Sequence, residues 1–272
     1  MGYNDPGTVS SLIEKLDAEK FDKNVFDKTG LFVVRNAIPA ALINEWKAEW
    51  DSFYEKNLAA GRNVNTSNPV DLKEPLPPKL ATIYKNDILL DFAEQVFGKN
   101  VALLNHRFVI KDKFSPGEIF LHHDYCYHVG LPDKASFFVP LSYAGKKNGG
   151  LTFYLGTHKY GYLGDAGEID PDNFKEVWPQ YTPELQPGDF IIMNSSLWHK
   201  SGINEVGIDR IVADIIYQPA NDPSGKELLR GSWQTDIFIQ HENRMKYFKN
   251  SRVSRIIDLT EKLKNSTKQP SI

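Results

Sequence analysis

The stretch Glu118-Ile119-Phe120-Leu121-His122-His123-Asp124 decides how the rest of the chain is interpreted. It follows the turn-forming pair Pro116-Gly117 and has the apolar content of a β-strand. Side chains two positions apart share one face of a strand, so we expect His122 and Asp124 to point into one cavity and His123 to point away. The pair is therefore a candidate for part of a metal site.

A second histidine and an arginine complete this candidate site. His199 lies downstream in Asn194-Ser195-Ser196-Leu197-Trp198-His199, and two histidines plus one carboxylate form the facial triad of non-haem Fe(II) oxygenases. In such enzymes a 2-oxo acid and O2 take the open metal positions, so a cation must hold the far carboxylate of the acid. Arg210 begins the next apolar run, and its planar guanidinium suits a carboxylate.

A His-x-Asp pattern alone is weak evidence, because it arises often by chance. Its context strengthens it, since the features that follow keep a fixed order. Four segments and one arginine carry a resemblance over about residues 100 to 220: Leu121-His122-His123-Asp124, residues 148–159, residues 185–190, residues 198–204 and Arg210. With them the chain resembles the phytanoyl-CoA hydroxylase-like branch of the Fe(II)/2-oxoglutarate dioxygenases. It departs from that branch at His123, where the branch usually has Gln, and at Leu155-Gly156-Thr157-His158, where it usually has the turn Pro-Gly-Ser-His.

The resemblance implies a role for each site residue. His122, Asp124 and His199 would bind Fe(II), with 2-oxoglutarate as co-substrate and O2 as oxidant. Arg210 and Ser201 would hold the far carboxylate, and Asn105 would contact 2-oxoglutarate from a preceding strand. The implied reaction hydroxylates, desaturates or cyclises an unactivated C–H bond and releases succinate and CO2. Related halogenases have a small residue at the position of Asp124, so halogenation is disfavoured.

The apolar pattern predicts a mainly β fold with flanking α-helices around a double-stranded β-helix, that is, a jelly-roll, cupin-like core. Strand-length apolar runs alternate with turn residues at 101–110, 118–124, 136–144, 151–155, 189–194 and 210–218. We expect one dioxygenase domain over 1–272, with a mainly helical flank at 1–100, the core and active site at 101–220, and a C-terminal helical extension at 221–272. Ser11 has the form of a helix-capping box, and Val253 to Leu263 suggest one C-terminal helix.

Composition excludes several classes of protein. The 272 residues are 41% hydrophobic and 25% charged, with net charge -3 and a pI of about 6.2, so no basic surface for nucleic acid or an anionic membrane is expected. No apolar run approaches the roughly 18 residues of a membrane span. Cys126 is the only cysteine, and the first residues form no apolar signal segment. We expect a cytoplasmic enzyme that acts on a small-molecule substrate. The sequence does not indicate the oligomeric state.

The sequence locates the pocket less sharply than the metal site. Two long turn-rich segments, Arg62 to Pro78 and Thr157 to Tyr181, are candidates for the pocket mouth, although their aromatics could equally pack locally. His106 and His128 are weaker candidates for the pocket lining, and His158 is expected to be a turn or core histidine. These segments suggest a small polar or amphipathic metabolite rather than a long acyl chain.

Three other classes of protein compete with the oxygenase. A redox-inert metal-dependent cupin enzyme, such as an isomerase or hydrolase, would leave Arg210 without a 2-oxo acid. A jelly-roll small-molecule binding protein would need no triad. A sensor derived from an oxygenase would usually have lost a ligand, and none is missing here.

Overall fold

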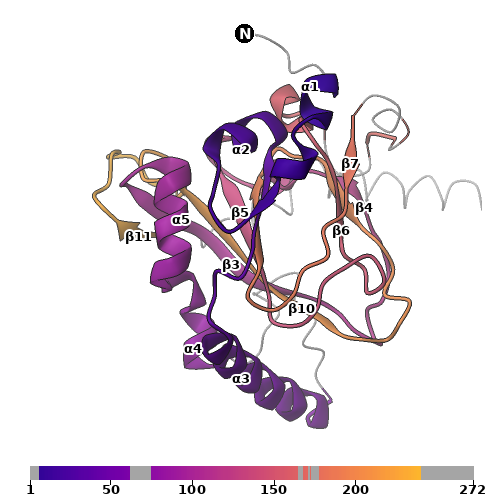
Figure 1. The fold of residues 1–272 in the computed structure, drawn as a ribbon. Helices are drawn as coiled ribbons and strands as arrows, with labels where there is room; N and C mark the ends of the chain where they lie inside the picture. Colours follow the sequence, from indigo (N-terminus) through magenta and orange to yellow (C-terminus); the bar gives the residue numbers. More distant parts are fainter. Residues whose placement is uncertain (1–5, 62–74, 165–167, 171, 173–177, 240–272) are drawn as a thin grey trace, which may run out of the picture.

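The structure is a computed structural model that describes residues 6–61, 75–164, 168–170, 172 and 178–239. Two β-sheets form its centre, and helices from the N-terminal third lie around one of them (Figure 1). This arrangement confirms the predicted jelly roll with flanking helices.

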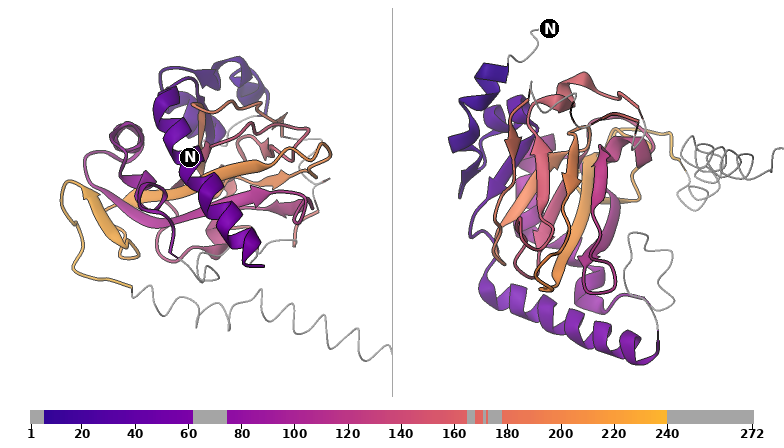
Figure 2. Two further views of the ribbon diagram at one scale, coloured as in Figure 1. Left: turned by 90° about the horizontal axis from the view of Figure 1, so that it is seen from below. Right: turned by 90° about the vertical axis from the view of Figure 1, so that its right-hand side faces the viewer.

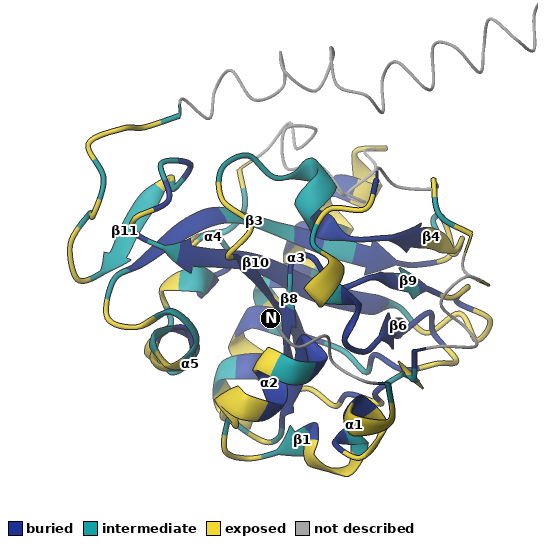
Figure 3. Ribbon diagram, turned by 90° about the horizontal axis from the view of Figure 1, so that it is seen from above, coloured by how far each residue is buried: buried dark blue, intermediate teal, exposed yellow. Residues whose placement is uncertain are grey.

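The larger sheet has seven strands in the order β1-β2-β8-β5-β10-β3-β11, and all its pairs except β1 with β2 are antiparallel. Its strands are β1 (Asp17–Ala18), β2 (Leu31–Val34), β3 (Val101–Lys111), β5 (Ala135–Pro140), β8 (Phe190–Asn194), β10 (Arg210–Pro219) and β11 (Glu227–Arg230). The central strands are buried on both faces, which Figure 3 shows as dark blue along β8 and β10.

The smaller sheet has four strands in the order β4-β9-β6-β7, and every pair in it is antiparallel. These are β4 (Ile119–His122), β6 (Leu151–Tyr154), β7 (Gln180–Tyr181) and β9 (His199–Ser201). β4 lies at the edge of this sheet, so its residues border solvent on one side.

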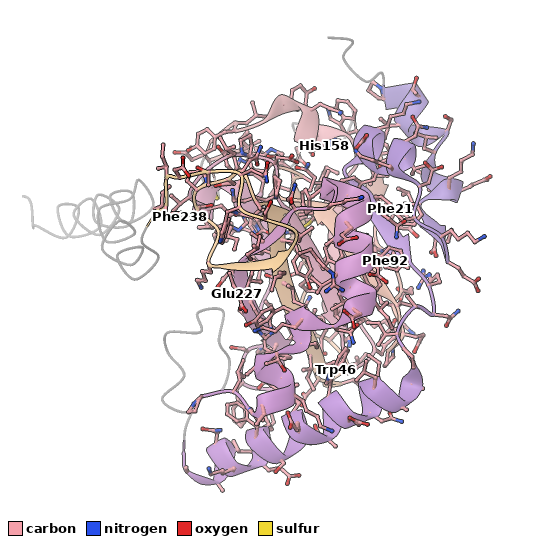
Figure 4. All side chains as sticks on the ribbon, turned by 90° about the vertical axis from the view of Figure 1, so that its left-hand side faces the viewer. Phe21, Trp46, Phe92, His158, Glu227 and Phe238 are labelled. Atoms are coloured by element: carbon pink, nitrogen blue, oxygen red, sulfur yellow. The ribbon has the colours of Figure 1, made fainter. Side chains whose placement is uncertain are left out.

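The described N-terminal third of the chain contains the helices α1 (Pro6–Ser10), α2 (Lys23–Thr29), α3 (Ala40–Ala59), α4 (Pro78–Ala81) and α5 (Asp87–Phe97). Of these, α2 contacts β2, and α5 contacts β3 and β10. The long α3 runs beneath the sheets in Figure 2. Its Trp50 lies 4.9 Å, between ring centroids, from Phe108 of β3, and Phe92 of α5 lies 5.2 Å from Phe190 of β8. Figure 4 labels Trp46 and Phe92 on this helical layer. No helix in the part of the chain described is long and apolar enough to cross a membrane.

The alternation of β3 separates the two faces of the larger sheet. Phe108 points to the helices, whereas Arg107 and Val109 line a cavity between the sheets. Directly opposite residues of an antiparallel pair share a face. The register pairs Arg107 with Asp214 and Lys111 with Arg210 across β3 and β10. The sheet therefore carries charged residues on its inner face at two levels.

Several local predictions need correction. Ser11 does not cap a helix, because α1 ends at Ser10 and the hydroxyl of Ser11 donates back to Thr8 O at 2.7 Å. The strand predicted to reach Asp124 ends at His122. Of the predicted helical extension 221–272, residues 221–239 form turns and strand β11, and 240–272, including the predicted helix 253–263, lie outside the described residues.

Candidate active site

Strand pairing brings the two histidines together. His122 at the end of β4 is directly paired with His199 at the start of β9, and their ring centroids lie 4.4 Å apart. The cross-strand pair fixes both imidazoles on the same face, since paired residues share a face. β9 is only three residues long and was not predicted as a strand, although His199 was predicted in the site.

A turn rather than strand alternation places the carboxylate. Asp124 is the first residue of a 3-10 helix, η4 (Asp124–Tyr127), and the His123 ring accepts a hydrogen bond from Cys126 N at 3.2 Å. His123 packs against Trp198 with ring centroids 4.7 Å apart, away from the site as predicted. His122 and Asp124 do converge as predicted. The predicted cause, alternation along one strand, was wrong, because the chain turns between the two residues.

The three side chains form a cluster that can hold one metal ion. Ligand atoms of His122, Asp124 and His199 all lie within 4.8 Å of one another, and all three residues are buried. Asp124 Oδ1 lies 3.7 Å from His122 Nε2 and 3.9 Å from His199 Nε2. Its other oxygen, Oδ2, accepts a hydrogen bond from Ser136 Oγ at 3.1 Å. The Oδ1 atom is thereby left facing the two imidazoles.

Backbone carbonyls orient both imidazoles toward that point. His122 Nδ1 lies 2.8 Å from Phe120 O, and His199 Nδ1 lies 2.9 Å from Leu197 O. A carbonyl only accepts, so each Nδ1 of the neutral ring carries the proton and donates it. Each Nε2 then keeps its lone pair for a metal, which is the usual outer support of a ligating histidine.

The charges of the cluster also suit a cation. Burial, followed by the neighbouring His199, lowers the pKa of His122 to about 4, so its imidazole is neutral at pH 7. Burial alone would raise the pKa of Asp124, but His199, Arg107 and His122 outweigh it and hold that pKa below its usual range. A neutral imidazole and an ionised carboxylate are the forms that coordinate a metal.

Arg210 lies in the same cavity without a carboxylate partner. It is fully buried, and its Nη1 donates to Gly149 O, while its Nε and Nη2 have no hydrogen-bond partner in the part of the chain that the structure describes. Among the described residues no carboxylate lies within 4.0 Å of it; burial lowers its pKa to about 10, so it stays charged at pH 7. A buried guanidinium with open donors is costly unless an anion binds there.

Ser201 adds a hydroxyl to this end of the cavity. It is 2% exposed on β9 and lines the cavity with Arg210, and its Oγ has no hydrogen-bond partner among the described residues. The empty space of the cavity, counted together with open solvent at its mouth, is about 390 Å³. Its donors thus fit the two groups expected: two histidines and a carboxylate for Fe(II), and an open guanidinium and hydroxyl for a carboxylate.

Other predicted residues lie elsewhere. Asn105 is not among the residues that line the cavity; its Oδ1 accepts a hydrogen bond from Lys226 Nζ at 3.2 Å. His106 packs between the rings of Tyr84 and Phe108 on the helical side. His128 is likewise absent from the lining.

The described part of the two predicted mouth segments does not line the cavity. Residues 62–74 lie outside the described residues. Trp178 is buried and donates from Nε1 to Tyr160 OH at 3.1 Å, so these aromatics pack locally. His158 is a half-buried histidine of the turn Thr157–Tyr160, in line with the prediction of a turn or core histidine, and its Nε2 lies 3.1 Å from Asp27 O.

Two charged residues of the cavity escaped the sequence analysis. Arg107 Nε donates to Asp214 Oδ2 at 2.7 Å, and Arg107 Nη2 lies 4.0 Å from Asp124 Oδ1. Burial raises the pKa of Asp214, yet the pair is charged at neutral pH, because arginine stays protonated and donates to it directly. The sequence does contain one signal for this pair, because Arg107 and Asp214 are opposite charges that each stand within an apolar strand.

Comparison with known proteins agrees with this site. The family model described as phytanoyl-CoA dioxygenase matches residues 26–212, more than half of the chain. The chain belongs to the phytanoyl-CoA dioxygenase family. Members of this family are non-haem Fe(II)/2-oxoglutarate oxygenases, so iron and 2-oxoglutarate are the cofactor and co-substrate of this chain. A search of curated proteins found no match.

Solved structures share the fold at low identity. The non-haem monooxygenase ThoJ in its apo form is 19% identical with a TM-score of 0.64, covering 89% of this chain and 99% of that chain. EctD from S. alaskensis, solved with 2-oxoglutarate and 5-hydroxyectoine, is 20% identical with a TM-score of 0.64, covering 82% and 85%. The epimerase SnoN, in complex with Fe3+, alpha ketoglutarate and nogalamycin RO, is 17% identical with a TM-score of 0.61, covering 86% and 98%.

Proposed function

We propose that this oxygenase hydroxylates an unactivated C–H bond of a small metabolite. His122, Asp124 and His199 would hold Fe(II), and Arg210 and Ser201 would hold the far carboxylate of 2-oxoglutarate. The observation that carries the proposal is the buried Arg210, whose open donors share one cavity with the His-Asp-His cluster. A redox-inert cupin enzyme or a binding protein would leave this guanidinium buried without a counter-ion.

The protein's own groups hold and orient the reactants. When bound, Fe(II) and 2-oxoglutarate supply the oxidising chemistry with O2, which yields succinate and CO2. Ser136 keeps one oxygen of Asp124 engaged, and the backbone carbonyls fix the two imidazoles, so the ligand atoms are preorganised. The carboxylate of Asp124 occupies the place that a halogenase would leave open, which favours hydroxylation.

The polar character of the inner wall supports a small polar or amphipathic substrate. Arg107 offers N–H groups beside Asp124, where the part of a ligand nearest the metal would lie. Ile119, 36% exposed on the edge strand, adds an apolar surface to the same cavity. A long acyl chain would need a more extended apolar groove. The cytoplasmic location stays a prediction.

One experiment separates these possibilities. The protein is loaded anaerobically with Fe(II) and 2-oxoglutarate, mixed with O2, and assayed for succinate across amino acids, nucleotides, sugars, phosphonates and acyl thioesters. Hydroxylation adds one oxygen to the substrate mass, whereas desaturation or ring closure removes two hydrogens. A protein that forms no succinate with any compound, and none above an Asp124→Ala control, would overturn the proposal.

A further inference from the structure

A second buried cation lies next to Arg210. Lys111, the last residue of β3, is paired directly with Arg210 of β10, and directly opposite residues share a face. Arg107 and Val109 of the same strand line the cavity, and the two-residue period puts Lys111 on that face as well, beside Arg210 but just beyond the residues that line the cavity itself. Lys111 is only 2% exposed.

Both cations converge on one glycine. A Cβ built on Gly149 would lie 2.5 Å from Lys111 Cδ and 3.1 Å from Lys111 Cε, so the lysine chain passes directly over this residue. The carbonyl of Gly149 accepts from Arg210 Nη1. Gly149 has φ +80, which also favours glycine. The missing side chain of Gly149 leaves the space that the lysine stem occupies.

The pair lacks a counter-ion within the described residues. The hydrogen bond found for Lys111 Nζ goes to the neutral carbonyl Gly117 O, and no described carboxylate lies within 4.0 Å of Lys111 or Arg210. Burial, followed by Arg210, lowers the pKa of Lys111 to about 8 against an opposing effect of Glu118, so it remains mostly charged at pH 7. Two buried like charges are unfavourable unless an anion compensates them.

We propose that Lys111 is a second cationic ligand of the far carboxylate of 2-oxoglutarate, acting with Arg210 and Ser201. The inference rests on the proposed function and adds a binding residue to it. A carboxylate has lone pairs for about four hydrogen bonds, enough for the open Nε and Nη2 of Arg210, the hydroxyl and an ammonium. The guanidinium fixes the orientation of the carboxylate, and Lys111 adds a point charge on a flexible stem.

The alternative is a structural lysine that only holds the β3–β4 turn through Gly117. Lys111→Met and Lys111→Gln both remove the charge, and the Gln variant keeps a polar group that can reach Gly117. Lys111→Arg keeps the charge. Lys113→Met is the matched control, because Lys113 is an exposed lysine two residues away. A structural role alone would lower the melting temperature and the Fe(II) affinity without a selective effect on 2-oxoglutarate.

The dissociation constants of Fe(II), and of 2-oxoglutarate on the Fe(II)-loaded protein, are measured by anaerobic calorimetry. We expect Lys111→Met and Lys111→Gln to weaken 2-oxoglutarate about tenfold or more, as for one lost charge-assisted contact, with Fe(II) affinity unchanged. Lys111→Arg should recover most of the affinity, and Lys113→Met should match the wild type. An unchanged 2-oxoglutarate affinity in both neutral variants, or an equal loss of Fe(II) affinity, would overturn the inference. If the wild type itself does not bind 2-oxoglutarate, the proposed function fails instead.

Discussion

Replacing Arg210 tests whether its buried charge is kept for a ligand or for the fold. In the structure its Nη1 donates to Gly149 O, whereas its Nε and Nη2 are buried and find no hydrogen-bond partner within the described ranges. Arg210→Lys keeps the charge but loses the two-pronged donor geometry, so about one charge-assisted hydrogen bond to 2-oxoglutarate is lost. Such a bond contributes about 1.5–3 kcal/mol, or roughly 10- to 150-fold in the dissociation constant.

Unlike the affinity for 2-oxoglutarate, the stability of the ligand-free protein should change little when Arg210 is replaced. Arg210→Met removes a desolvated cation, which favours the fold, but leaves Gly149 O without its donor, which costs about 1–3 kcal/mol. Because these effects oppose each other, we expect the melting temperature of Arg210→Met to stay within a few degrees of the wild type. Its affinity for 2-oxoglutarate should fall further than that of Arg210→Lys, because both open donors are gone.

The assay combines anaerobic titration of 2-oxoglutarate into Fe(II)-loaded protein with thermal unfolding of the same variants without ligand. A loss of affinity at nearly constant stability supports the reasoning. The reasoning is refuted by a variant that melts far below the wild type while its dissociation constant for 2-oxoglutarate stays within twofold. Arg210 would then be a structural residue, and the cavity would bind some other ligand.

Three further perturbations test other parts of the site and the core. Asp124→Ala should abolish succinate formation and retain the fold, as checked by circular dichroism; turnover near the wild-type level would remove Asp124 from the metal site. Ser201→Ala should weaken 2-oxoglutarate by about 1 kcal/mol, roughly fivefold, which is less than Arg210→Lys, and a larger loss would contradict that order. Burial lowers the pKa of His106 from 6.5 to about 4, so folding stability is lost as the pH falls from 6.5 toward 4, by up to about 3 kcal/mol for this residue. His106→Phe should therefore flatten this part of the stability curve in urea unfolding at pH 7 and pH 5, and equal pH dependence in the two proteins would show that His106 does not titrate as described.

The metal site could be predicted because its signal is local and chemically specific. His122 and Asp124 are two residues apart, and the number of side-chain combinations that bind a redox metal is small. The pairing of His122 with His199 was harder to predict from the sequence. It depends on a three-residue strand and on a long-range register, and neither leaves a clear mark on the sequence.

The other charged residues of the cavity could not be predicted for the same reason. Arg107 and Asp214 each stand within an apolar run, where a single charge is unusual, but nothing in the sequence says that β3 pairs with β10. The family resemblance implied Asn105, two positions before Arg107, but that side chain bonds Lys226 instead. Charges in central strands are informative once the register is known, because each needs a partner or a ligand on the same face.

The β3–β10 pair explains how the cavity can orient a dicarboxylic acid. Arg107, Asp214 and Arg210 line the cavity, and the register places Lys111 beside Arg210, four residues beyond Arg107 on β3. At the usual rise of a strand this separates the two levels by roughly 13 Å along the backbone. Asp214 pairs with the arginine at the metal end, whereas no described carboxylate lies within 4.0 Å of Lys111 or Arg210 at the far end. Arg210 therefore attracts one carboxylate of a dicarboxylic acid. The 2-oxo end of the acid is then directed toward the metal ligands before any contact with substrate is made.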